Sequence, residues 1–154
     1  MGLSANEISE IKATWAIPAA TPSESGQAIL LEFFRRYPAN LQKFKDFKDM
    51  TLDELKVSPR FHAHANKIIL TFDEAIKTLG TDESPAALQK IWSKIATSHV
   101  KRGISRESYM ELKEVILEIL TAVCKLNAEQ QAAWDKLVTA VYDIIFKTMD
   151  DLGK

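Results

Sequence analysis

Three histidines are the side chains of this sequence best suited to hold a metal or a metal-containing cofactor. His62 and His64 are two positions apart, so on a helix they point to different faces. His64 belongs to a stripe of apolar residues at helical spacing that includes Ile68, whereas His62 lies outside that stripe. His99 comes next in a second stripe, after Ile95. A histidine on an apolar stripe is usually an ordinary core residue, but two of them on two helices can share one site.

Other kinds of reactive site lack their ligands or motifs in this chain. A structural zinc site takes four ligands, commonly cysteine and histidine at close spacing, and here one cysteine accompanies three scattered histidines. Cys124 lies in the apolar segment LTAVCKL, which favours a small buried side chain over a nucleophile. The sequence contains no HExxH, no CxxC, no GxGxxG and no GxxxxGK[ST]. The carboxylates fall on polar helix faces, so no acid–base pair stands out.

The overall composition is that of an ordinary globular chain. Its 154 residues fit a single domain, residues 1–154, and 20 basic and 21 acidic residues give a formal net charge of −1. This balance creates no long-range attraction to nucleic acid or to an anionic membrane, so we expect neither as a partner. No apolar run is long enough to span a bilayer. The first residues, MGLSANEISE, lack a signal region, although a mature secreted chain would look the same.

The elements that position the histidines are helices throughout. Helix starts are marked by a capping side chain three residues before Glu or Gln, or directly before Pro. The first kind occurs at Ser4, Thr51 and Asn127, and the second at Thr21, Ser58 and Ser84. Gly80 and Gly103 follow periodic segments, as C-terminal glycines do. The predicted helices span residues 4–18, 22–37, a short turn after Pro38, 51–56, 59–79, 85–99, 106–125 and 128–152. Short connections between them indicate a compact all-α fold.

Several segments, taken in order, resemble the globin family. FFRRYPANLQKFKDF resembles the end of the second globin helix and the corner that follows it. In this corner Pro38 is followed six positions later by Phe44, and Phe47 comes three positions after that. HANKIIL resembles the helix of the distal histidine, and IATSHVKRG resembles the helix of the proximal histidine. The family's first-helix tryptophan is matched by Trp15, its helix-crossing residues by Gly26 and Ala65, and its residue over the ligand by Leu30.

The resemblance extends over residues 3–152 and is most specific in HANKI, SHVKRG and AAWDKL, which look most like the larval haemoglobins of midges. It departs from the common globin pattern between the two histidines. His64 and His99 are 35 residues apart, and the extra residues fall in GTDESPAALQ. The shape of this connection, rather than the ligand assignment, is therefore the unusual feature.

The resemblance implies a globin fold of about eight helices around a pocket for haem b (iron protoporphyrin IX). His99 would be the proximal iron ligand, with the Ile95 carbonyl and the Ser98 hydroxyl near its other ring nitrogen. His64 would be the distal hydrogen-bond donor to oxygen, with Leu30 and Ile68 beside it. The cofactor-binding residues expected on this basis are Phe44, Phe47, His64, Lys67, Ile68, Ile95, His99, Arg102 and Ile104. Lys67 and Arg102 would either pair with haem propionates or be plain surface cations.

The function implied by the resemblance is oxygen transport or storage without enzymatic turnover, with carbon monoxide and nitric oxide as further ligands. The alternative is a globin with nitric-oxide dioxygenase or peroxidase-type activity. A haem sensor would need an output domain, and an all-α binder of apolar ligands would lack haem and its Soret absorption. A midge-like globin would be extracellular, in haemolymph, with a cytoplasmic location as the alternative. The chain would be a monomer or a homodimer.

Overall fold

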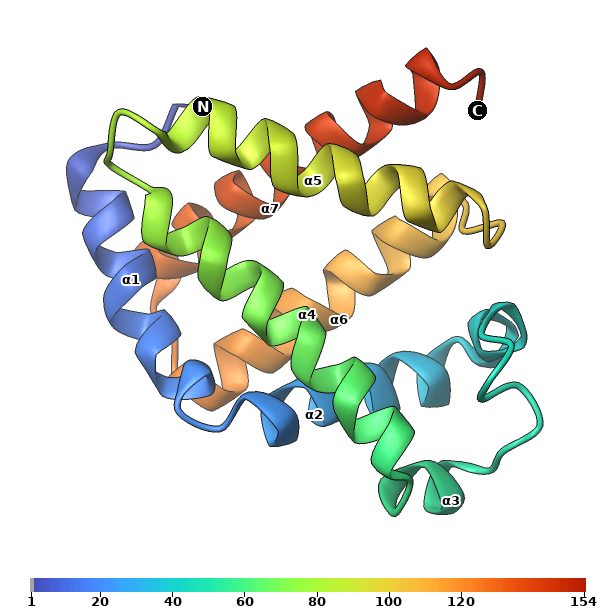
Figure 1. Cartoon of the computed structure of the whole chain (residues 1–154). Helices are drawn as coiled ribbons and strands as arrows, with labels where there is room; N and C mark the ends of the chain where they lie inside the picture. Colours follow the sequence, from blue (N-terminus) through green and yellow to red (C-terminus); the bar gives the residue numbers. More distant parts are fainter. Residues whose placement is uncertain (1) are drawn as a thin grey trace.

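The computed structural model describes residues 2–154, which form seven α-helices and one 3-10 helix (Figure 1). In chain order these are α1 (Ala5–Ala19), α2 (Pro22–Arg36), η1 (Pro38–Lys43), α3 (Leu52–Lys56), α4 (Pro59–Thr78), α5 (Ser84–Val100), α6 (Arg106–Cys124) and α7 (Ala128–Asp151). The described residues contain no strand, and the all-α prediction is confirmed. Met1, which belongs to the segment inspected for a signal, lies outside them. Among these helices, none combines the length and the apolar character that crossing a membrane requires.

Capping side chains begin four helices as the sequence predicts. Ser4, Thr51 and Asn127 each accept a hydrogen bond from the backbone N–H three residues later. The Glu or Gln at that position accepts one in return from the N-cap backbone, which completes a capping box in each case. Ser58 accepts from the backbone N–H of Phe61 at the start of α4, the helix that carries His64.

Of the other two predicted caps, Thr21 does occupy the N-cap position of α2, with a proline at the start of the helix, whereas Ser84 does not cap α5. Thr21 makes no capping bond to α2, and its hydroxyl lies 3.2 Å from the hydroxyl of Ser25 instead. Ser84 is the first residue of α5 rather than its cap, and its buried hydroxyl has no hydrogen-bond partner among the described residues. A proline follows each of them, and its preset helical φ favours a helix start at this point. These two helices therefore begin without a side-chain cap.

The connection between α4 and α5 is a tight corner. Gly80 has a left-handed backbone, with φ of 82°, directly after the α4 C-cap. The backbone N–H of Thr81 then donates to the carbonyl of Thr78, and that of Ser84 donates to the carbonyl of Thr81. The extra residues of GTDESPAALQ thus form a short turn and the first turns of α5, not a long loop. From this corner α4 and α5 diverge (Figure 1).

The helices α2 and α4 are the most extensively packed pair, and they cross at Gly26. A Cβ atom at this position would lie 2.1 Å from the carbonyl oxygen of Ala65, so only glycine permits the observed approach of the two backbones. The helix that carries His64 is therefore held against α2 at the residue after the histidine. The small residues that the sequence matched to the family's helix crossing do meet in the structure.

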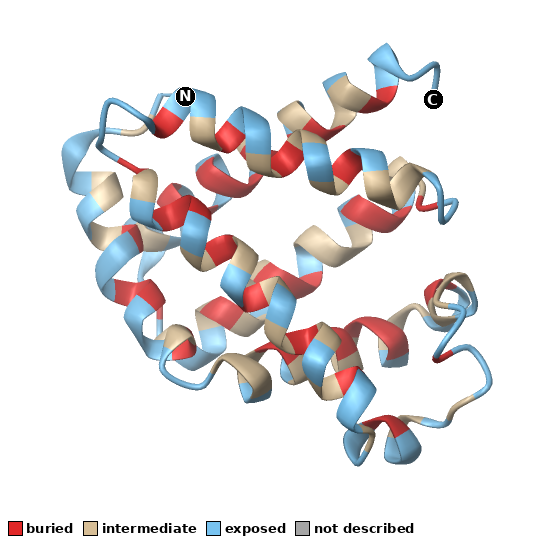
Figure 2. Cartoon of the chain, viewed as in Figure 1, coloured by how far each residue is buried: buried red, intermediate tan, exposed pale blue. Residues whose placement is uncertain are grey.

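Buried residues lie on the inner faces of the helices and exposed residues on the outer faces (Figure 2). Apolar residues at helical spacing in α7 are buried from Trp134 to Met149, but Leu152 is 45% exposed because it lies past the end of the helix. In the stripe around His64 in α4, Ile68 is only half-buried, and so is Ile95 in α5. These two residues face a cavity, which explains their residual exposure.

Candidate functional site

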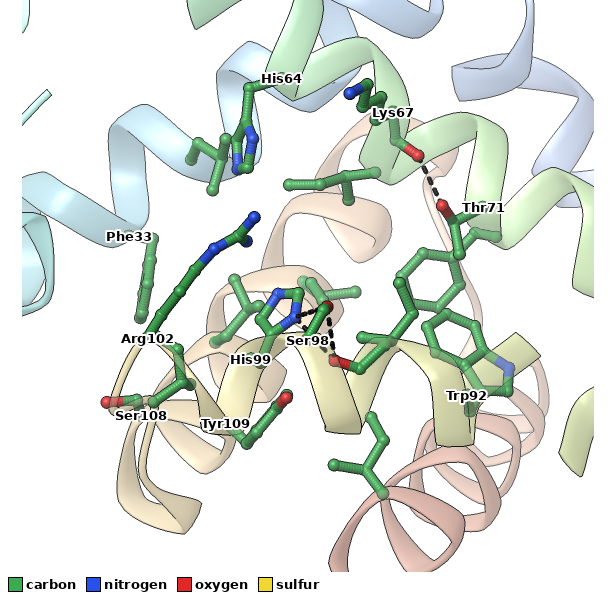
Figure 3. A pocket seen from close by; sticks show the side chains of 18 of the residues that line it. Phe33, His64, Lys67, Thr71, Trp92, Ser98, His99, Arg102, Ser108 and Tyr109 are labelled. Atoms are coloured by element: carbon green, nitrogen blue, oxygen red, sulfur yellow. Dashed lines mark hydrogen bonds between the residues drawn. The ribbon is translucent and has the colours of Figure 1, made fainter. Parts of the chain in front are cut away.

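A cavity of about 410 Å³ lies between α4 and α5 and reaches α2, α6 and α7 (Figure 3). Its walls are mainly apolar, and a histidine projects into it from each of two opposite sides, His64 from α4 and His99 from α5. The predicted site residues that line it are Leu30, Phe44, His64, Lys67, Ile68, Ile95, His99, Arg102 and Ile104. The structure thus brings together side chains from α2, the corner after it, α4 and α5.

The ring of His99 is oriented by its own helix. Nδ1 lies 2.8 Å from the carbonyl oxygen of Ile95, one turn earlier, and 3.1 Å from the hydroxyl of Ser98. The Ser98 hydroxyl donates its single proton to the same carbonyl, at 3.0 Å, so it does not donate to Nδ1. The ring proton is therefore assigned to Nδ1, which donates to the Ile95 carbonyl. Nε2 then carries a free lone pair, and the ring points into the cavity (Figure 3). This is the arrangement of a histidine that ligates a metal.

The charge state of His99 suits the same role. Burial lowers the pKa of His99, the hydrogen bond to Ile95 acts against this, and the positive charge of Arg102 lowers it further. A lowered pKa keeps the imidazole neutral at neutral pH, and only a neutral ring has a lone pair to offer a metal. Tyr109 lies beside His99, with its ring centroid 6.2 Å away, and supports it from α6.

His64 is held between aromatic rings on the opposite wall. Its centroid lies 5.6 Å from that of Phe44 and 5.8 Å from that of Phe47, both in edge-on geometry. Burial, followed by the electrostatic influence of Arg102, His99 and Lys67, lowers the pKa of His64 to about 4, with Asp46 acting in the opposite direction. The ring is therefore neutral and has one N–H to donate. It makes no hydrogen bond to any residue of the range 2–154, so this donor is available to a ligand in the cavity.

Phe47 and His62 lie outside the cavity. Phe47 is 4% exposed and packs against Phe61, Phe44 and His64, so it supports the distal wall without lining the cavity. His62 has its Nε2 at 2.6 Å from the backbone carbonyl of Lys56, away from the cavity. The inference that the two neighbouring histidines face different sides is confirmed.

The sequence reasoning did not single out the lining residues contributed by α6 and α7. Among the further lining residues are Phe33, Asn40, Trp92, Ser108, Tyr109, Leu112, Ile116, Tyr142 and Ile145. A residue that lines a buried cavity has the same helical spacing as one in a filled core, so periodicity cannot separate the two. One local signal in α6 and α7 is the occurrence of polar Tyr109 and Tyr142 on apolar faces. Their hydroxyls are buried without a partner among the described residues, and burial raises the pKa of both.

The comparison with protein families decides between a filled core and a cofactor site. The family model described as Globin matches residues 27–145. The chain belongs to the globin family. Its membership implies haem binding, and the relatives of this globin are haemoglobins, a class of mainly oxygen-binding proteins.

Relatives of this globin come from several flies and midges. It is 30% identical to globin CTT-VI of the midge Chironomus thummi thummi over 91% of this chain and 84% of the midge protein. A solved hexa-coordinate haemoglobin of Drosophila melanogaster is 52% identical, with a TM-score of 0.92 and 94% of each chain covered. The haemoglobin of the botfly Gasterophilus intestinalis is 35% identical, with a TM-score of 0.88, covering 96% of this chain and 99% of the botfly chain. Insect globins, the midge ones included, are thus the relatives that the motifs indicated.

The residues of the cavity fit a haem. Within residues 2–154 no three His, Cys, Asp or Glu side chains gather where they could hold a bare metal ion. A metal in this cavity must therefore bring most of its ligands with it, as haem iron does. His99 presents a free Nε2 that could ligate the iron, and the mainly apolar walls, Ile68 and Ile95 among them, would suit a porphyrin. The cations Lys67 and Arg102 line the same cavity.

Proposed function

We propose that this globin holds haem b and binds molecular oxygen reversibly, for oxygen transport or storage. The observation that carries the proposal is the pair of neutral histidines on opposite walls of one apolar cavity, one with a free ring nitrogen and the other with a free N–H. Bound haem supplies the ferrous iron at which a diatomic molecule binds reversibly. Every other element of the function comes from side chains of the protein.

His99 holds the iron through Nε2, and the hydrogen bond to the Ile95 carbonyl fixes its tautomer and ring angle. His64 donates its N–H to an oxygen molecule in the distal half of the cavity, which stabilises oxygen more than the less polar carbon monoxide. Leu30, Phe44 and Ile68 line this half and keep water away from it, which slows oxidation of the iron.

The role proposed for Lys67 and Arg102 is to pair with the haem propionates. Both line the cavity, and neither forms a salt bridge with another residue in the part of the chain that the structure describes. Ile104 is 9% exposed and lines the cavity after the end of α5, so we assign it a contact with the porphyrin. Phe47 contributes indirectly, because it holds Phe44 and His64 in place.

The decisive experiment replaces His64 with leucine and measures oxygen dissociation. Loss of a hydrogen bond to a partly charged acceptor costs roughly 1.5–3 kcal/mol, so oxygen should dissociate roughly ten- to a hundredfold faster. Carbon monoxide binding should not weaken. His62→Leu is a matched control, since it makes the same change two residues away on a side chain that faces Lys56. Oxygen release at the wild-type rate from His64→Leu would show that His64 is not the donor.

The assignment of His99 has its own test. His99→Gly removes the tie to the iron, so the purified protein should contain little haem, and added imidazole should restore a ferrous spectrum close to that of the wild type. His62→Gly should keep its haem without imidazole. Normal haem content and an unchanged spectrum in His99→Gly would contradict the assignment.

A second candidate is a globin in which His64 itself ligates the iron when no external ligand is present. The similar Drosophila melanogaster haemoglobin is described as hexa-coordinate, and the lowered pKa of His64 makes its neutral ring available for this role here. We pair this candidate with the alternative function, nitric-oxide dioxygenase or peroxidase-type turnover. The visible spectrum of the deoxygenated ferrous protein separates the two. A six-coordinate spectrum that becomes five-coordinate in His64→Leu supports the second candidate, and a five-coordinate wild type excludes it.

The location that we propose follows the similarity to midge globins. We assign the protein to an extracellular fluid such as haemolymph, with the cytoplasm as the alternative, and to a single domain that is a monomer or a homodimer. Immunodetection in haemolymph and in washed cells distinguishes the two locations. Sedimentation velocity of the haem-loaded protein distinguishes the two assemblies.

A further inference from the structure

A second hollow lies directly outside His64, where the corner of residues 43–47, the first half of α4 and the end of α5 come together. We call it the outer hollow, and its volume is about 620 Å³. The basic side chains that line it are Lys43, Lys45, Arg60, Lys67, Lys101 and Arg102. Phe44, His64, Lys67 and Arg102 also line the inner cavity, so the two spaces share a wall.

The outer hollow concentrates positive charge. Six of the chain's 20 basic residues line it with a single carboxylate, Asp46, although the chain as a whole has a net charge of −1. Asp46 is already paired with Arg60, at 3.3 Å. A concave surface lined by charges of one sign focuses its field and raises the local concentration of counter-ions. The charge is therefore arranged to attract an anion to this one place.

Most of these cations have no partner that would neutralise them. Lys43 donates to the neutral hydroxyl of Ser108 at 2.9 Å, which leaves its charge uncompensated. Lys45, Lys67, Lys101 and Arg102 form no salt bridge with any other residue between positions 2 and 154. The propionates of a haem would engage Lys67 and Arg102, because these two also line the inner cavity. Lys43, Lys45 and Lys101 line only the outer hollow and remain for another anion.

We propose that the outer hollow binds a small polyvalent anion of the polyphosphate class. Phosphate oxygens accept charge-assisted hydrogen bonds from several lysines at once, and the cations here come from three segments that surround one space. The concave shape favours a small molecule over an acidic protein surface, which would cover a broad patch of roughly 800 Å² on each partner.

Binding at this place has a consequence for the inner cavity, and this consequence rests on the proposed function. The anion would tie the corner, α4 and α5 to one another immediately outside His64 and Phe44, two of the four residues that line both spaces. A diatomic ligand that enters past His64 must cross this space. We therefore expect the bound anion to slow carbon monoxide association after flash photolysis, with no change in the haem content.

Titration calorimetry of the haem-loaded protein with inorganic tripolyphosphate, at ionic strength fixed with sodium chloride, tests the binding itself. We expect one saturable site per chain. Lys45→Gln with Lys101→Gln, which removes two cations that line only the outer hollow, should weaken binding by roughly tenfold or more. Lys12→Gln with Lys90→Gln makes the same change of net charge at exposed positions outside the hollow and should leave binding unchanged.

Three results would overturn the proposal: no saturable heat, equal weakening by the two double variants, or tighter binding of an acidic peptide than of tripolyphosphate. The last result would assign the surface to an acidic protein partner. Because calorimetry does not depend on oxygen, failure of anion binding leaves the proposed oxygen function intact. A wild-type oxygen dissociation rate in His64→Leu, in turn, leaves the anion site intact.

Discussion

The crossing of α2 and α4 offers a sharp test of how the fold positions His64. In Gly26→Ala, the new Cβ would lie 2.1 Å from the carbonyl oxygen of Ala65, 2.6 Å from its carbonyl carbon and 3.1 Å from its Cα. Real Cβ contacts are essentially never shorter than 3.0 Å, so the two helices must separate by at least about 0.9 Å at this point. All three obstructing atoms are backbone, and no side-chain rotation can relieve the clash.

Two opposing effects set the expected loss of stability. Overpacking of a tight interface costs typically about 1–3 kcal/mol, and here the upper half of this range applies because rigid backbone must move. Replacement of glycine by alanine within a helix stabilises by about 1 kcal/mol. The free energy of unfolding should therefore fall by about 1–2 kcal/mol. Ala28→Gly, on the exposed face of the same helix, measures the propensity effect alone.

The separation should also affect oxygen, because Ala65 directly follows His64 on α4. A displacement of about 1 Å is enough to misalign a hydrogen bond, so oxygen should dissociate up to about tenfold faster from Gly26→Ala. Urea denaturation of the carbon monoxide complex measures the stability, and stopped-flow displacement of oxygen by carbon monoxide measures the rate. Ala65→Gly in the same background should rescue neither quantity, since the clash is with backbone atoms. If Gly26→Ala is about 1 kcal/mol more stable than the wild type and releases oxygen at the wild-type rate, the contact is not a rigid constraint.

Three further predictions concern single residues. Phe44→Ala should speed haem transfer to an apo-acceptor protein. Because Phe44 is half-buried, the loss of stabilising free energy should lie near or below the lower end of the about 3–5 kcal/mol usual for a buried phenylalanine. An unchanged transfer rate would show that its ring does not contact the haem. The pKa of His64, lowered to about 4, means that oxygen dissociation measured over a pH series should quicken only as the pH falls toward about 4. Because the pKa of His64 in the folded state lies below its unfolded value of 6.5, its stabilising contribution should be complete above about pH 6.5 and should decline as the pH falls toward 4. A His64→Leu variant with the same acid response would refute this account. Lys125, the α6 C-cap, has a left-handed backbone with φ of 52°, which is strained for a residue with a side chain. Lys125→Gly should therefore stabilise the protein by about 0.5–1 kcal/mol in thermal or urea unfolding, and a loss of stability would contradict this strain.

The features that the sequence predicts well are those fixed by neighbours in the chain. The apolar spacing around His64 and His99 places both on inward helix faces, and the bond from His99 to Ile95 spans a single helical turn. The capping boxes at Ser4 and Thr51 likewise join residues three positions apart. Each of these depends on local geometry that a helix repeats everywhere, so the residue types alone are enough to predict them.

The features that escaped prediction join distant parts of the chain. The hydroxyl of Ser108 donates to the side chain of Asn40 at 2.6 Å and accepts from Lys43 at 2.9 Å, across more than sixty positions. These residues form part of the cavity wall or of the outer hollow, yet no spacing rule connects η1 with α6. The left-handed Lys125 was missed for a different reason, since that backbone conformation is usually signalled by glycine or asparagine.

The two histidines lie at nearly the same distance from the tight corner between α4 and α5. His64 lies 14 residues before the end of α4 at Thr78, and His99 lies 15 residues after the start of α5 at Ser84. At 1.5 Å per residue each histidine lies about 21–23 Å along its helix from the corner. A rotation of either helix by only about 3° at the corner therefore moves its histidine by about 1 Å. The helices α4 and α5 diverge from this corner, and none of the residues 79–83 that form it lines the cavity. Substitutions there can adjust the height of the cavity, and with it the ligand affinity, while every residue that lines the cavity stays the same.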